Sequence, residues 1–134
     1  MTIRYSTDDR CTVEETANIF MSSGIRRPCH DIDRIRRMLE HADEIVTARD
    51  GEKLVGLLRA ITDYSYCCYI SDLAVNRSYH GQGIGTELVG QLKLKLGNEE
   101  IQYVLTSAPK SSGFYERIGF AKAENAFVIK RQIN

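Results

Sequence analysis

The sequence predicts a mixed α/β fold of 134 residues, built on a central and mostly antiparallel sheet. One observation is a hairpin signal, because the apolar runs 44–49 and 53–61 flank Asp50-Gly51, a pair that favours a tight turn between strands. Another is the order of strand and helix patterns, which reads strand, two helices, three strands, helix, strand, helix, strand. No repeat or linker interrupts this order, so we expect a single domain over residues 1–134.

The first elements are a short strand at 3–5 and two helices. Thr12 and Glu15 fit a capping box at the start of the first helix, and Gly24 predicts its end. The second helix is expected to start near Asp31. Its apolar positions share one helix face: Ile32, Ile35, Leu39 and Ala42.

The run 53–61 is almost continuously apolar, which is typical of a central strand covered on both faces. The elements expected after it are a strand at 66–75, a helix at 86–96 that stops at Gly97, a strand at 102–107, a short helix at 112–118 and a final strand at 126–133.

The charge balance limits the partners that we expect. Eighteen Lys and Arg residues balance eighteen Asp and Glu residues, whereas binding to a nucleic-acid backbone normally needs a basic excess. No apolar run approaches the ~18 residues of a membrane span, and the N-terminus does not resemble a signal peptide. We therefore expect a cytoplasmic protein with neither a nucleic-acid nor a membrane partner.

The four cysteines, Cys11, Cys29, Cys67 and Cys68, have no metal-ligand spacing, so we expect reduced thiols and no metal site. Cys67 and Cys68 are neighbours in an expected strand, so their side chains should point to opposite faces.

A glycine-spaced turn, with Gly81, Gly83 and Gly85, lies between an expected strand and an expected helix. The first amides of a helix lack intrahelical partners and its dipole is positive at that end, so this turn predicts an anion site. The dinucleotide fingerprint fails because Thr86 occupies its last glycine position, and no Gly-Lys-Ser/Thr of a P-loop follows. The turn therefore indicates another phosphorylated cofactor.

The segment 80–85, His-Gly-Gln-Gly-Ile-Gly, resembles the Gln/Arg-x-x-Gly-x-Gly/Ala signature of the GCN5-related N-acetyltransferases (GNAT). The segment 114–120, Phe-Tyr-Glu-Arg-Ile-Gly-Phe, is similar to a second signature of that family, Phe-Tyr-x-x-x-Gly-Phe. His80 departs from the family's Gln or Arg. The resemblance implies an acyl-CoA N-acyltransferase fold, in which a mixed, mostly antiparallel sheet is flanked by about four helices.

The resemblance also implies a reaction, in which an acetyl group passes from acetyl-CoA to a primary amine by direct attack in a ternary complex. The pyrophosphate would lie on the amides of 81–86, and the pantetheine arm would pair with the strand before them. Ser107 stands where many relatives carry Asn. The implied cofactor-binding residues are Leu73, Ala74, Val75, His80, Gly81, Gln82, Gly83, Ile84, Gly85, Thr86, Ser107, Ser112 and Tyr115.

Tyr115 is the candidate general acid, because a phenol of pKa ~10 can donate a proton to a departing thiolate of normal pKa ~8.5. Its alternative role is that of an aromatic core residue. Asp72 is the candidate general base, directly or through water, and its alternative role is structural. Glu44 and Asp63 are poorer candidates for the base.

The resemblance places the acceptor site around the first two helices and their loop, at Ile25, Arg26, Arg27 and Cys29. Arg26 or Arg27 could hold a substrate carboxylate, or both could be solvated surface residues. The acceptor, a small-molecule or peptide amine, is not identified by any motif. Homodimers are common in the family and are a further expectation. A non-catalytic acyl-CoA-binding module, or a transferase for another acyl group, is the alternative function.

Overall fold

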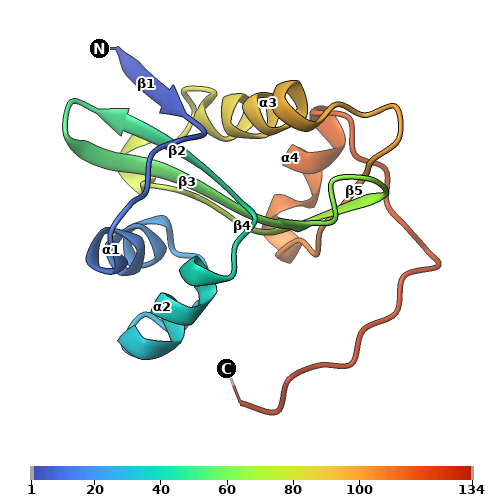
Figure 1. Ribbon diagram of the computed structural model, residues 1–134, viewed down its shortest axis with the longest axis horizontal. Coiled ribbons are helices and arrows are strands. Elements are labelled where there is room, and N and C mark those ends of the chain that lie inside the picture. The colour runs from blue at the N-terminus through green and yellow to red at the C-terminus, as the bar shows by residue number, and fades with distance from the viewer. Residues whose placement is uncertain (1, 134) are drawn as a thin grey trace.

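The computed structural model describes residues 2–133, in which helices cover both faces of a five-stranded sheet (Figure 1). The elements in chain order are β1 (Ile3–Ser6), α1 (Val13–Ser23), α2 (Ile32–Glu40), β2 (Glu44–Asp50), β3 (Lys53–Thr62), β4 (Cys67–Val75), the 3-10 turn η1 (Arg77–Tyr79), α3 (Ile84–Leu96), β5 (Gln102–Val104), the 3-10 turn η2 (Pro109–Ser111) and α4 (Ser112–Arg117). The predicted mixed α/β fold with a mostly antiparallel sheet is confirmed.

The strands follow the order β1-β2-β3-β4-β5, and every neighbouring pair is antiparallel except β4 and β5. The predicted hairpin joins β2 to β3, with Asp50 opposite Lys53 and Gly51 at a φ of 60°. β3 is the central strand, and its residues from Leu54 to Ala60 are buried, as the apolar run predicts.

The core lies on both faces of the sheet. Val46, Leu58 and Leu88 belong to the cluster under α3, whereas Phe20 and Ile35 belong to the cluster under α1 and α2. Gly56 permits the close approach of α3, because a Cβ there would lie 2.9 Å from Ile84 Cγ2. The start of α3 is therefore fixed against the middle of the sheet.

The predicted helix caps are confirmed. Glu15 N donates to Thr12 Oγ1 at 3.0 Å and Thr12 N donates to Glu15 Oε1 at 2.9 Å, which makes the reciprocal capping box. α1 ends at Gly24, whose φ is 79°. The Asp31 side chain caps α2. The helix ends at Glu40, so Ala42, the last member of the predicted apolar face, lies outside it.

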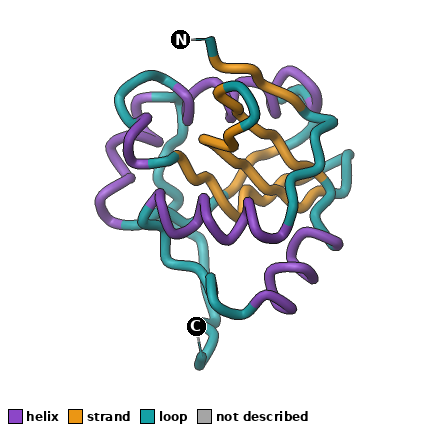
Figure 2. Tube along the Cα trace, turned by 90° about the vertical axis from the view of Figure 1, so that its left-hand side faces the viewer, coloured by secondary structure: helices purple, strands orange, loops and turns teal. Residues whose placement is uncertain are grey.

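The end of the chain departs from the prediction. β5 stops at Val104 rather than at 107, and residues 126–133 form no strand. A strand needs a ladder partner, and no strand in the described part of the chain pairs with 126–133. Phe127 and Ile129 are consequently solvent-exposed. Figure 2 shows this loop reaching beyond the body of the molecule.

The cysteine side chains lie as expected, with Cys67 exposed and Cys68 buried on opposite faces of β4. All four thiols are free. Across residues 2–133, no cluster of three or more His, Cys, Asp or Glu side chains could hold a metal ion. No helix in the same range combines the length and the apolar character needed to cross a bilayer.

Candidate functional site

The candidate site begins at a gap between β4 and β5. β5 pairs with β4 only from Cys67 to Tyr69, so no described strand lies beside residues 70–75 on that side. Asn76 N donates to Val55 O at 2.9 Å, and this bond shows which alternate residues of β4 hydrogen-bond to β3. In that alternation, the main-chain groups of Leu73 and Val75 face away from β3 and into the gap. An extended ligand that carries amides can use this edge as a neighbouring strand would.

A β-bulge lies at the head of the gap. The register shifts between Arg59 and Ala60, and Ser71 is the unpaired residue on β4. Arg27 Nη2 donates to the Ser71 carbonyl and Arg59 Nη2 donates to Ser71 Oγ, both at 2.7 Å. Two arginines, from the α1–α2 loop and from β3, therefore hold the bulge.

Asp72 is buried between the same two arginines. Its Oδ1 accepts from Arg27 Nε and its Oδ2 accepts from Arg59 Nε, each at 2.5 Å. Because both oxygens are paired with guanidinium groups, neither is free to take a proton from an incoming amine. This geometry disfavours Asp72 as the general base and favours its structural alternative.

The two other carboxylates considered for the base also have structural partners. Glu44 is buried, pairs with Lys95 at 2.8 Å and accepts from Tyr64 Oη at 2.7 Å. Asp63 caps the β3–β4 turn by accepting three backbone amides, which lowers its pKa to about 2. Glu44 therefore has both oxygens paired, and Asp63 is held in the turn through Oδ1.

The glycine turn leads from the gap into α3. Gly81 and Gly83 each have a φ of 80°, a left-handed conformation that glycine adopts without strain, and a Cβ at either would meet nothing within 4 Å. Gly83 is the N-cap of α3 and supplies no side-chain bond, so the first amides of this 13-residue helix lack a capping side chain. The predicted anion site therefore has the required open backbone geometry.

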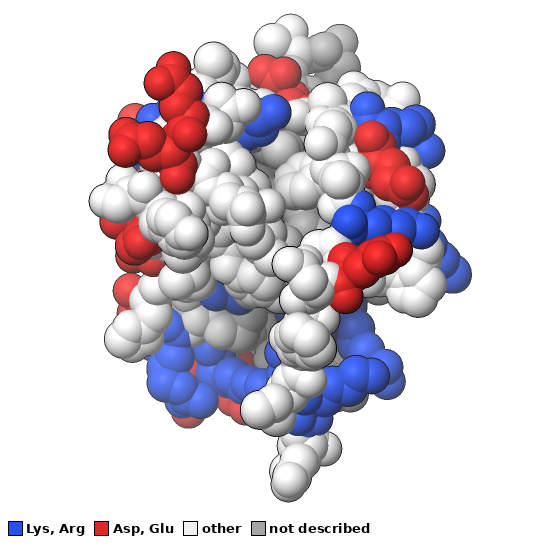
Figure 3. Space-filling model, turned by 90° about the vertical axis from the view of Figure 1, so that its right-hand side faces the viewer, with Lys and Arg blue, Asp and Glu red and all other residues white. Residues whose placement is uncertain are grey.

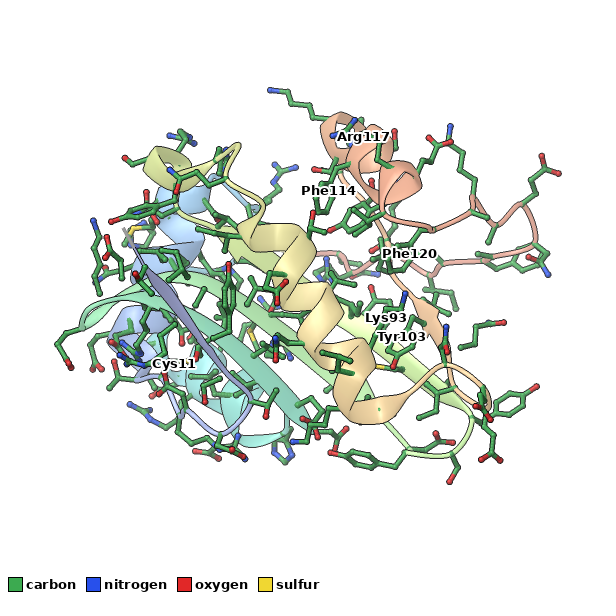
Figure 4. The ribbon with its side chains drawn as sticks, turned by 90° about the horizontal axis from the view of Figure 1, so that it is seen from above. Cys11, Lys93, Tyr103, Phe114, Arg117 and Phe120 are labelled. Atoms are coloured by element: carbon green, nitrogen blue, oxygen red, sulfur yellow. The ribbon has the colours of Figure 1, made fainter. Side chains whose placement is uncertain are left out.

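Gly85 serves a different purpose. Its φ is not left-handed, but a Cβ there would lie 3.2 Å from Phe114 Cζ, so the missing side chain makes room for α4. Leu73, at the edge of the gap, lies close to the same position. The short helix α4 is thereby packed against the start of α3, and Figure 4 shows Phe114 between the two helices.

Tyr115 lies between two aromatic rings. Its ring packs edge-to-face on Phe114, with centroids 5.1 Å apart, and on Phe120, with centroids 5.6 Å apart. Burial raises the pKa of Tyr115, and the Arg27 guanidinium opposes part of that rise. The phenol is therefore protonated at neutral pH and lies within the electrostatic reach of the α1–α2 loop.

His80 turns back toward the gap. Its Nε2 lies 2.8 Å from the Val75 carbonyl, and since a carbonyl only accepts, Nε2 carries the proton and donates it. The imidazole thus caps one of the edge carbonyls of β4. This contact places His80 beside the expected pantetheine path rather than over the glycine turn.

Two serines have expected cofactor contacts: Ser107 lies between β5 and η2, and Ser112 is the first residue of α4. Ser107 Oγ donates to the Ala108 carbonyl at 2.7 Å, and Ser112 Oγ donates to the Pro109 carbonyl at 3.4 Å. Of the other expected cofactor residues, Gln82 and Thr86 are exposed, whereas Ile84 buries its side chain and offers only its backbone.

The expected acceptor residues separate into two groups. Ile25 and Cys29 are half-buried and pack against the core under α1 and α2, and Arg26 is exposed. Arg27 alone of the four bonds to the head of the gap.

Arg59 was not predicted as part of the site. Its signal is nevertheless present, because a charged side chain in an otherwise apolar central strand needs a buried partner. That partner is Asp72.

Comparison with known proteins identifies the family. The model of a family described as "Acetyltransferase (GNAT) domain" matches residues 16–131. An uncharacterized N-acetyltransferase of Pyropia yezoensis is 25% identical, over 86% of this chain and 77% of its own length. The chloroplastic GCN5-related N-acetyltransferase 2 of Arabidopsis thaliana is 35% identical over 53% of this chain, a region that spans only 30% of that relative.

Solved structures share the fold. A protein from meticillin-resistant Staphylococcus aureus superposes with a TM-score of 0.81 at 24% identity, covering 97% of this chain and all of its own. A GNAT family acetyltransferase from Streptococcus pneumoniae has a TM-score of 0.76 at 24% identity, covering 98% of this chain and all of its own.

Proposed function

The chain belongs to the GNAT family of acetyltransferases, and we propose that it transfers an acetyl group from acetyl-CoA to a primary amine. The observation that carries the proposal is the continuity of three features: the open β4 edge at Leu73 and Val75, the left-handed glycines, and the uncapped start of α3. This path suits a ligand with an amide-bearing arm at one end and a pyrophosphate at the other.

Acetyl-CoA, when bound, supplies an acetyl group activated as a thioester. The main-chain groups of Leu73 and Val75 would hold the arm in register along β4, and the first amides of α3 would hold the pyrophosphate. The arm and the His80 imidazole would both use the Val75 carbonyl, so His80 would either leave this carbonyl or share it with the arm. Holding the acceptor amine beside the thioester in one orientation supplies much of the acceleration.

Tyr115 is the proposed general acid. It is half-buried, it extends from α4 next to the start of α3, and its raised pKa keeps the proton on the phenol at neutral pH. The proton donated to the departing thiolate would come from this hydroxyl. Asp72 is proposed as a positioning residue that fixes Arg27 at the head of the gap, and solvent water would take the proton of the amine.

The test is thiol release from acetyl-CoA with a panel of small amines and peptides, in the wild type and in Tyr115→Phe. We expect Tyr115→Phe to keep acetyl-CoA affinity, measured by calorimetry, and to lose ~10²–10⁴-fold in turnover. Tyr66→Phe is the matched control, because Tyr66 is exposed and belongs to neither signature. Acetyl-CoA binding with no thiol release for any amine would instead indicate a non-catalytic binding module, and release only from other acyl-CoA thioesters would indicate a different donor.

A further inference from the structure

The cluster of Arg27, Asp72 and Arg59 carries more positive than negative charge. Its two guanidinium groups share the single Asp72 carboxylate, and no other carboxylate in residues 2–133 forms an ion pair with either arginine. Arg59 is nevertheless buried, with 7% of its surface exposed. Because an uncompensated charge in the interior is costly, an anion that reaches this cluster is stabilised there.

Arg59 also has a donor left for such an anion. Its Nε donates to Asp72 and its Nη2 to Ser71 Oγ, but its Nη1 has no hydrogen-bond partner in residues 2–133. Every buried side-chain nitrogen or oxygen in the same range has a partner, so Nη1 lies where solvent or a ligand can reach it. The Ser71 hydroxyl accepts from Arg59 and can donate its own proton to the same anion.

An apolar hollow adjoins this polar pair. Ile61 is two residues from Arg59 on β3, and Tyr69 is two residues from Ser71 on β4, whereas the residues between them belong to the core under α3. All four side chains therefore lie on the opposite face of the sheet. Ile61, Tyr69 and Val104, each about two-fifths exposed, line an open hollow of about 460 Å³, hereafter the β5 hollow. This volume is typical of a small-molecule site.

Charge is unevenly distributed around the β5 hollow. Asp63 is the charged side chain in its lining, but it lies at the β3–β4 turn, four residues from Arg59 and so about 13 Å away along an extended strand. In Figure 3, which looks onto the side where β5 and α4 lie, the middle is uncharged, and Lys and Arg predominate at the lower end, the level of α2 in Figure 1. A ligand in the hollow therefore meets an apolar surface with a cationic end at Arg59.

The Arg59 end of the hollow is also the head of the gap. A cofactor arm that pairs with Val75 and then Leu73 would bring its thioester toward Ser71. An acceptor beside that thioester therefore needs an amine close to an anionic group and an apolar group close to both. The α-carbon of an apolar amino acid carries all three.

We propose that the acceptor is a free α-amino acid with a large apolar side chain. Its carboxylate accepts from Arg59 Nη1 and Ser71 Oγ, its side chain fills the β5 hollow, and its free amine faces the thioester. The nitrogen lone pair attacks the carbonyl carbon, so that a C–N bond forms while the C–S bond breaks and leaves its electron pair on sulfur. The nitrogen loses one proton to water, and Tyr115 gives one to the thiolate. This assignment rests on the proposed acetyl transfer.

The first test compares three acceptors in the thiol-release assay: L-phenylalanine, its amide, which lacks the carboxylate, and glycine, which lacks the side chain. We expect kcat/KM for L-phenylalanine to exceed that for each of the others on the order of tenfold or more. Equal values for L-phenylalanine and its amide would overturn the acceptor class and leave the acetyl transfer standing.

Arg59→Lys tests the carboxylate contact, because it keeps the charge beside Asp72 and removes Nη1. The preference for L-phenylalanine over its amide should fall on the order of tenfold, chiefly through KM, and this ratio cancels the different reactivity of the two amines. A merely structural role for Arg59 would lower both rates equally and is excluded by a change in the ratio. Ser71→Ala leaves both arginines in place and should lower the same ratio, so a fold lost in Arg59→Lys does not prevent the test.

Ile61→Ser/Val104→Ser tests the β5 hollow. The preference for L-phenylalanine over glycine should fall on the order of tenfold, while glycine itself is affected little. Leu94→Ser is the matched control, because Leu94 is an apolar residue of α3 that is 80% exposed. A preference that survives the double substitution shows that the side chain does not occupy the hollow and overturns the inference.

Calorimetry with CoA present separates this inference from the proposed function. If no amine releases thiol, acetyl transfer fails, and binding alone decides the site. L-Phenylalanine that binds the wild type more tightly than its amide does, and loses this advantage in Arg59→Lys, supports an amino-acid site. Equal binding of the two, or no binding of either, contradicts it.

Discussion

At the scale of single residues, the contacts of Asp72 distinguish between two roles that the sequence leaves open, a general base and a structural carboxylate. A carboxylate before the glycine turn suits a general base, yet Arg27 and Arg59 occupy both of its oxygens. Two guanidinium groups surround one buried carboxylate. Removing any member of this cluster would leave an uncompensated charge in the interior, which is energetically costly. The cluster therefore ties the α1–α2 loop to the β4 bulge and fixes Arg27 near Tyr115.

This arrangement predicts the effects of Asp72→Asn. Removing the carboxylate leaves the buried Arg59 uncompensated, so we expect the free energy of unfolding to fall by ~3–5 kcal/mol. The activity that remains should keep the wild-type shape of its pH dependence, since the substitution would not remove the proton acceptor. Denaturant unfolding and a pH profile of kcat/KM measure the two effects.

The matched control is Asp33→Asn, which breaks the exposed Asp33–Arg36 pair of α2 and should cost no more than ~1 kcal/mol. If Asp72→Asn stays stable but loses the base-dependent limb of the pH profile, Asp72 is the base after all.

The site cluster was only partly predictable at this scale. Asp72 and Arg27 are recognisable as candidates, but they lie 45 positions apart, and Arg59 lies 13 positions from Asp72. Their pairing depends on how the α1–α2 loop folds over β4, which no local pattern encodes.

At the scale of elements, glycine is needed at the three positions before and in α3 for two different structural reasons. Gly81 and Gly83 are required by backbone conformation, whereas Gly85 is required by the approach of Phe114. The turn itself is predictable because strand, glycines and helix are adjacent in sequence. The need for glycine at position 85 is not predictable in this way, because it arises from contact with Phe114 of α4, which is distant in sequence.

The two causes predict different outcomes for two alanine substitutions. Gly83→Ala places a Cβ on a left-handed residue, so we expect a loss of ~1–2 kcal/mol in stability and about tenfold or more in CoA affinity. Gly85→Ala asks only that Phe114 shift by a few tenths of an ångström, so both losses should be smaller. Thermal unfolding and calorimetric titration with CoA measure them, and equal losses for the two variants would contradict the assignment.

The end of the sheet shows a similar limit. Residues 126–133 have a strand pattern, but a pattern specifies only a tendency to pair, and the partner must come from elsewhere. By contrast, the helix caps at Thr12 and Asp31 were predictable because capping bonds span three residues.

At the scale of the whole molecule, one cluster of charged side chains joins the sheet to the start of α1. Arg49 of β2 is buried and donates through Nε to Asp9 at 2.6 Å and through Nη1 to Glu15 at 2.7 Å. Glu15 also completes the capping box of α1. The start of α1 is therefore held both by its own cap and by a strand of the sheet.

The cluster predicts how the molecule responds to acid. The Arg49 hydrogen bonds lower the pKa of both Asp9 and Glu15 in the folded chain. A carboxylate whose pKa is lowered by folding stabilises the fold fully above its unfolded pKa, ~3.9 for Asp and ~4.3 for Glu, and loses that contribution as the pH falls through its folded value. We therefore expect the free energy of unfolding to be level near neutral pH and to decline below about pH 4.5.

Arg49→Met removes the cause of both pKa shifts. Because Arg49 is buried while Asp9 and Glu15 are partly solvated, we expect a loss of ~1–3 kcal/mol at pH 7. Between pH 5 and 3 the variant should lose less stability than the wild type, because its carboxylates titrate closer to their unfolded values. Urea unfolding across this range measures the slopes, with Arg36→Met as the exposed control that leaves the wild-type slope in place. Parallel slopes for Arg49→Met and the wild type would show that Arg49 does not set the acid stability of the fold.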